Sequence, residues 1–73
     1  MDDLDRIRIK PGLMGGRPTI RGMRVTVGMI VGEIRAGVPI AELLASYPYI
    51  EREDVLQALA FATRHPEMYR RPQ

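Results

Sequence analysis

The chain has 73 residues, a formal net charge of +2, no cysteine and a single histidine, His65. A domain this short buries only about 60% of the surface that its unfolded chain exposes. With no cysteine and one histidine, stabilisation by a disulfide or a zinc site is nearly excluded. We therefore expect a homodimer, whose interface would bury additional apolar surface. No apolar run approaches the roughly 20 residues of a membrane span, and the acidic N-terminus does not resemble a secretory signal, so we expect a cytoplasmic protein.

Positive charge is concentrated near the start of the chain. Between residues 6 and 24 there are six basic side chains and no acid: Arg6, Arg8, Lys10, Arg17, Arg21 and Arg24. Such a block suits a polyanion such as nucleic acid, or an acidic groove on a protein. A basic face that is merely solvated is an equally open interpretation.

The first predicted element is a short strand. The segment Arg6–Lys10 alternates basic and apolar residues, which places Ile7 and Ile9 on one face of a strand. A strand of this length needs a partner. We expect the partner to be a second extended piece at residues 20–25, from the same chain or from another subunit, after a turn-rich connection.

Helical periodicity begins at Thr26. Apolar residues spaced i, i+3, i+4 and i+7 from Val27 predict an amphipathic helix with Thr26 as N-cap and Gly37 as its stop. Pro39 opens a second helix at a tolerated first position, and Pro48 closes it.

The third predicted helix begins near Glu51 and ends before His65. We expect its inward face to carry Val55, Leu56, Leu59, Ala60 and Ala62. The fold class is therefore mainly α, a tri-helical helix-turn-helix-like unit preceded by a short β-strand pair or arm. We expect one domain over 1–73, divided into a basic β arm (5–25), a three-helix unit (26–65) and a short tail (66–73).

Several strings in the chain resemble one known family. They are Gly-Arg-Pro-Thr-Ile-Arg-Gly-Met-Arg-Val at 16–25, Gly-Val-Pro-Ile-Ala-Glu-Leu-Leu at 37–44, Tyr-Pro at 47–48, Glu-Asp-Val at 53–55 and Ala-Leu-Ala-Phe-Ala at 58–62. Together they look like the bacterial and archaeal domain-of-unknown-function family 433, over roughly residues 5–68. Glu51 departs from the family resemblance, because it stands where a Ser or Thr cap would be expected.

The resemblance implies a function. Members of that family are understood as small helix-turn-helix-like proteins, many of them VapB-type antitoxins encoded beside a PIN-like ribonuclease toxin. By resemblance, this chain would be the antitoxin of a type II toxin–antitoxin system. It would block the nuclease by protein contact and regulate its own transcription by binding operator DNA.

The candidate nucleic-acid-binding residues are the six cations of the basic segment together with Arg52 and Gln57, which we expect on the exposed face of the third helix. Arg and Gln are suited to reading guanine and adenine. The acids in the first turn of that helix count against it, so we expect the basic arm to supply much of the affinity for DNA. Ion pairs from Arg17, Arg21 or Arg24 to Asp2, Asp3 or Asp5 are the alternative.

The candidate toxin-binding residues are Met68, Tyr69 and Arg70, near the C-terminus. His65 ends a helix and precedes a proline, which favours a capping or exposed role over catalysis. We expect no enzymatic activity, cofactor, metal, membrane contact or small-molecule substrate. Two other functions stay open from the residues: a stand-alone DNA-binding transcriptional regulator, and a structural dimerisation or adaptor module.

Overall fold

A computed structural model describes residues 4–69, excluding the side chains of the last two. In chain order the elements are β1 (Ile7–Ile9), the 3-10 turn η1 (Met14–Gly16), β2 (Pro18–Ile20), α1 (Val27–Arg35), α2 (Ile40–Ser46), α3 (Arg52–Arg64) and α4 (Pro66–Tyr69). The expected fold class, mainly α with a preceding β-strand pair, is confirmed.

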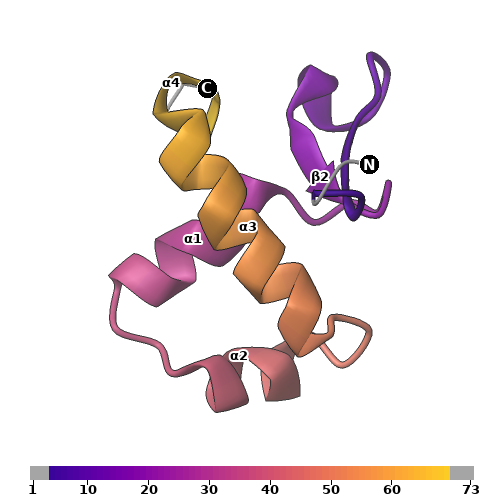
Figure 1. Ribbon diagram of the computed structural model, residues 1–73. Helices are drawn as coiled ribbons and strands as arrows, with labels where there is room; N and C mark the ends of the chain where they lie inside the picture. Colours follow the sequence, from indigo (N-terminus) through magenta and orange to yellow (C-terminus); the bar gives the residue numbers. More distant parts are fainter. Residues whose placement is uncertain (1–3, 70–73) are drawn as a thin grey trace.

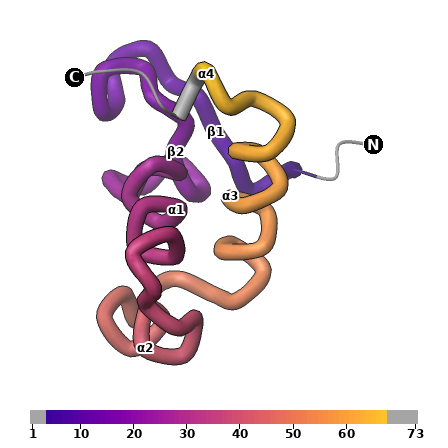
Figure 2. Tube along the Cα trace, turned by 90° about the vertical axis from the view of Figure 1, so that its left-hand side faces the viewer, coloured from indigo at the N-terminus to yellow at the C-terminus, as the bar shows by residue number. Residues whose placement is uncertain are grey.

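The three longer helices enclose the core. Helix α3 crosses α1, and α2 closes the end of this pair that lies away from the strands (Figure 1). Seen from the side, α1 and α3 stand next to each other, and the β arm lies above α1 and beside the upper part of α3 (Figure 2). The fully or nearly fully buried apolar side chains come from the N-terminal segment, from all three helices and from the connection before α3: Leu4, Ile20, Val25, Val27, Ile30, Val31, Leu43, Ile50, Val55, Ala58, Phe61 and Ala62.

The two strands pair within the chain. β1 and β2 are antiparallel, with Ile7 opposite Ile20 and Ile9 opposite Pro18. The second extended piece lies earlier than the predicted 20–25, because a tight turn at 21–24 reverses the chain so that α1 can begin. Arg21 and Gly22 have left-handed backbones there, with φ of 51° and 74°. Val25 returns beside Ile20, whose N–H donates to the Val25 carbonyl at 2.8 Å.

The ends of α1 follow the local signals of the sequence. The Thr26 hydroxyl accepts the N–H of Met29 at 3.0 Å, which confirms the predicted N-cap. After Ala36 the chain turns through Gly37, whose φ is 94°, a value that favours glycine. α2 and α3 also begin and end within two residues of the predicted limits.

The buried stripe of α3 differs from the prediction. Leu56, expected inside, is 41% exposed, and Gln57, expected outside, is 7% exposed. The inward positions are Asp54, Val55, Gln57, Ala58, Phe61 and Ala62. Gln57 replaces an apolar residue in this stripe because its amide is hydrogen-bonded to the arm, which removes the cost of burying it. Among the described residues, no helix is long and apolar enough to cross a membrane.

Candidate nucleic-acid interface

Asp54 joins the basic arm to the helices. Its side chain is fully buried and accepts four hydrogen bonds. One oxygen accepts Arg6 Nη1 and Arg21 Nε, both at 3.1 Å. The other accepts Arg21 Nη2 at 2.9 Å and the N–H of Glu51 at 2.8 Å. A buried carboxylate is tolerated only when it is paired in this way, so the arm and the start of α3 depend on one another.

Two opposing influences act on the pKa of this carboxyl. Burial raises the pKa of Asp54 and is the largest single influence. The hydrogen bonds from Arg21, from the Glu51 N–H and from Arg6 together outweigh burial, and the pKa of Asp54 lies below its ordinary value of 3.8. Asp54 is therefore a permanent anion at neutral pH, and it holds both guanidinium groups in fixed positions.

Further contacts attach the arm to the same end of α3. Arg6 Nη1 contacts a Glu51 carboxylate oxygen at 2.5 Å, and this bond is the main reason that the pKa of Arg6 is raised. Arg21 also donates to the Tyr49 carbonyl at 2.7 Å. One turn further along the helix, the Gln57 amide accepts the Arg6 N–H at 2.9 Å and donates to Asp5 at 3.1 Å. The arm is thus docked through both backbone and side-chain groups.

These contacts divide the six predicted cations into three groups. Arg6 and Arg21 are engaged by Asp54, so the alternative of ion pairing holds for Arg21, with a different acid from those expected. Asp2 and Asp3 lie outside the described residues. Arg8, Lys10 and Arg24 are exposed, and Arg17 is half-buried. We call Arg8, Lys10 and Arg24 the exposed cation set.

Two members of the exposed cation set lie near one turn. A Cβ atom built on Gly22 would be 3.2 Å from the Lys10 ammonium, so the lysine side chain packs over the turn that carries Arg24. Arg8 lies on the adjoining strand, opposite Thr19. The Thr19 hydroxyl is buried and donates to the Arg8 carbonyl at 3.0 Å, which holds this part of β1 in place. The positive charges of Arg8, Lys10 and Arg24 are therefore exposed on a segment whose backbone is held by hydrogen bonds.

Of the two α3 side chains that were predicted to read bases, only one lies on the exposed face of the helix. Arg52 is exposed, as predicted. The prediction for Gln57 is wrong, because this residue is buried and its amide is committed to Arg6 and Asp5. Glu51 and Asp54, which counted against a phosphate surface, are paired with the arginines of the arm, so α3 presents less negative charge than its sequence indicates.

The predicted toxin-binding residues fall at the limit of the described chain. Met68 and Tyr69 belong to the backbone of α4, and Arg70 lies outside the described residues.

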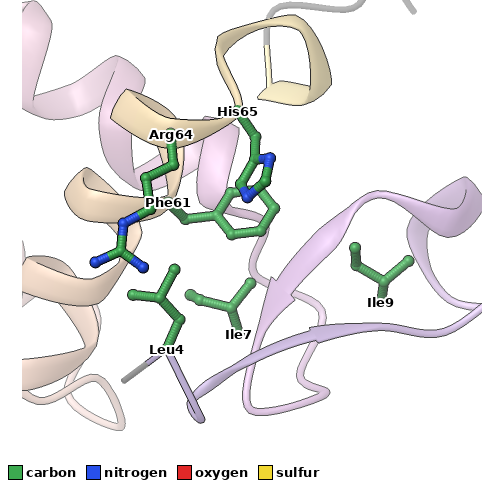
Figure 3. A pocket seen from close by; sticks show the side chains of 6 residues that line it. All are labelled: Leu4, Ile7, Ile9, Phe61, Arg64 and His65. Atoms are coloured by element: carbon green, nitrogen blue, oxygen red, sulfur yellow. The ribbon is translucent and has the colours of Figure 1, made fainter. Parts of the chain in front are cut away.

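Just before α4, a half-open groove of about 300 Å³ separates β1 from the end of α3 (Figure 3). His65 lines it as the C-cap of α3, with its ring centroid 4.7 Å from that of Phe61. Among the described residues, no three His, Cys, Asp or Glu side chains form a group that could hold a metal ion.

Sequence reasoning missed the anchoring role of Asp54. A usable signal was present, since acids elsewhere in the fold can pair with part of a run of six cations that contains no acid. The only dense acidic cluster beyond the N-terminus is Glu51, Glu53 and Asp54. Their position in the first turn of a helix explains them equally well through the helix dipole, which hid the second role.

Comparisons with known proteins identify the family of this chain. The family described as "Protein of unknown function (DUF433)" matches residues 7–62. The crystal structure of a DUF433 member from Anabaena variabilis, at 2.00 Å resolution, superimposes with a TM-score of 0.85 and 38% identity, over 90% of this chain and 65% of that one. An uncharacterized protein, y4eO, from Sinorhizobium fredii is 31% identical over 75 residues, covering 97% of this chain. The chain spans only 34% of that relative's length.

Proposed function

This chain belongs to the DUF433 family, and from that premise we propose that it is the antitoxin of a type II toxin–antitoxin pair, which binds its own operator DNA and neutralises a PIN-like ribonuclease by protein contact. The observation that carries the DNA-binding half is the exposed cation set. Arg8, Lys10 and Arg24 are exposed on the arm, whereas Arg6 and Arg21 are paired with Asp54 and Glu51. Lys and Arg side chains on such a surface bind phosphates.

The arm and α3 have different tasks in this proposal. Phosphate contacts position a protein on DNA without reading its sequence. Base reading is assigned to the exposed face of α3, where Arg52 is the side chain suited to guanine. The ion pairs of Asp54 keep the two parts at a constant separation, so that phosphate and base contacts form in one register. The three helices would then act as a helix-turn-helix unit, with α3 as the recognition helix.

A gel-shift titration at two salt concentrations tests the DNA-binding half. The probes are the DNA upstream of this gene and an unrelated duplex of equal length. We expect tighter binding to the upstream DNA, and Arg52→Ala to cost about 1–3 kcal/mol on that probe only. Arg35→Ala, on α1 outside the proposed surface, is the control and should leave both probes unchanged. Equal affinity for the two probes would contradict operator recognition.

The neutralising half rests on the family resemblance and is tested separately. The chain is co-expressed with the adjacent reading frame, and growth and co-purification are measured. We expect the neighbour alone to stop growth, and the pair to grow and to purify together. A toxic neighbour that neither co-purifies nor loses its toxicity would refute the antitoxin role. Specific DNA binding without any toxic neighbour would instead support the stand-alone regulator.

A further inference from the structure

Strand β1 is an open edge of the sheet. β2 is paired on both sides, by β1 and by the bridge between Thr19 and Thr26. Among the described residues, β1 is paired on one side only. An open edge is a template to which another extended chain can add. Its short length and its flanking cations limit self-association, and they also restrict which chain can bind.

The backbone groups on this edge can be assigned from the strand register. The Arg6 N–H donates to Gln57, but the Arg6 carbonyl accepts the Arg21 N–H at 2.6 Å, so the Arg6 carbonyl and then both backbone groups of Arg8 point towards β2. Ile7 and Ile9 therefore direct theirs to the open edge. The Ile7 N–H is used by the Leu4 carbonyl at 3.1 Å. This leaves the Ile7 carbonyl and both backbone groups of Ile9 to receive a new strand.

The same two isoleucines line the groove between β1 and α3. Leu4, Ile7 and Phe61 face one another across it, and Ile9 lies further along (Figure 3). Ile9 is 49% exposed although it is a strand residue. A strand added to the edge would place side chains beside Ile7 and Ile9, at the spacing of cross-strand neighbours, and so would cover this apolar surface.

We propose that the β1 edge and its groove form a docking site for an extended segment of a partner protein in which Asp or Glu alternates with Val, Ile or Leu. The apolar residues of that segment enter the groove, and its acidic residues face Arg8 on the opposite side of the strand. Main-chain hydrogen bonds to Ile9 and Ile7 supply affinity, and the alternating pattern supplies selectivity. The proposal does not depend on the partner being a nuclease.

Charge selects this occupant over a second copy of the chain. Among the described residues, the groove lining contains no acid, and Arg8 is the exposed side chain on the other face of β1. Two-fold antiparallel pairing of β1 with itself would set Arg8 opposite Arg6, Arg8 or Lys10 of the second copy in some registers, and a basic residue opposite an isoleucine in the others. Like charges directly opposite each other destabilise a strand pair, whereas an acid opposite Arg8 stabilises it.

The test uses the full chain and a fluorescein-labelled seven-residue peptide of alternating glutamate and valine, followed by fluorescence anisotropy. In antiparallel pairing, the peptide residue opposite Ile9 lies on the same face of the sheet as Ile9, so it is a valine that faces the groove. The N–H and C=O of this valine both bond to the backbone of Ile9. N-methylation of the valines should therefore abolish binding. N-methylation of the glutamates, whose N–H groups point away from β1, should leave it unchanged. A peptide with lysine in place of glutamate should bind at least tenfold more weakly.

Variants of the chain provide the second arm of the test. Ile9→Glu should weaken binding of the glutamate–valine peptide at least tenfold, because it removes apolar surface and repels the acids. Leu56→Glu replaces another exposed apolar residue, outside the groove, and should bind as the unmodified chain does. Circular dichroism checks that both variants fold. Equal binding by the valine-methylated peptide, equal loss in Leu56→Glu, or an Ile9→Glu change that only dissociates a dimer would each overturn the proposal.

Discussion

Replacing Asp54 with asparagine tests whether this carboxylate holds the arm to the helices. Asparagine keeps the shape of the side chain but exchanges one oxygen for an NH2 group. Two of the four donors that now contact Asp54 would then face another donor. The variant therefore measures the charge and the acceptors of this side chain without opening a cavity.

The expected loss follows from the number of bonds. A hydrogen bond that involves a charged group contributes about 1.5–3 kcal/mol, so two of them contribute about 3–6 kcal/mol. The Arg6 and Arg21 side chains are 28% and 38% exposed, and water replaces part of what they lose. We therefore expect Asp54→Asn to lower the free energy of unfolding by about 2–3 kcal/mol, and Tm by about 10–20 °C for a domain of this size.

Urea unfolding followed by far-ultraviolet circular dichroism measures this loss. Glu53→Gln is the matched control, because Glu53 is an exposed acid in the same turn of α3. Its replacement removes a favourable interaction with the helix dipole and should cost less than about 1 kcal/mol. If Asp54→Asn loses no more stability than Glu53→Gln, the arm is not held by this carboxylate.

Three further predictions concern the same region. Because the pKa of Asp54 is lowered in the folded chain, its contribution to stability is present above the ordinary value of 3.8 and is lost as pH falls through the lowered value. Acid titration of stability should therefore show a steeper loss below about pH 4 in the unmodified chain than in Asp54→Asn. Gly22→Ala should destabilise by about 1–2 kcal/mol, because φ is 74° and the new Cβ would meet Lys10, whereas Gly12→Ala, with open space around it, should change the free energy of unfolding by less than about 1 kcal/mol. Gln57→Ala should cost about 1–3 kcal/mol and speed amide exchange at Arg6, because the Arg6 N–H loses its acceptor; unchanged exchange would show that the Gln57 amide does not hold the arm.

The parts of the fold that were predicted correctly depend on neighbouring residues. The Thr26 cap and the Gly37 stop act within one helical turn, and the alternation around Ile7 and Ile9 acts within one strand. Signals of this range are contained in a short window of sequence. The second strand was misplaced because Arg21 adopts a left-handed backbone that non-glycine residues rarely take.

The site could be predicted only in part, because its organising contacts are distant in sequence. Arg6 and Asp54 are separated by 48 positions, and Arg21 and Asp54 by 33. No local pattern distinguishes the two arginines bound by Asp54 from those that remain exposed. Gln57 was misassigned for the same reason, since a glutamine is expected outside until its partner, the Arg6 backbone, is known.

The salt dependence of DNA binding tests the role of the exposed cation set most directly. The logarithm of the association constant falls with the logarithm of salt concentration by about 0.9 for each phosphate neutralised on duplex DNA. For the combined variant Arg8→Ala, Lys10→Ala and Arg24→Ala, we predict a slope shallower by about 2–3 and weaker binding to every duplex. An unchanged slope in the folded variant would show that these three cations do not meet DNA, and would contradict the proposed interface.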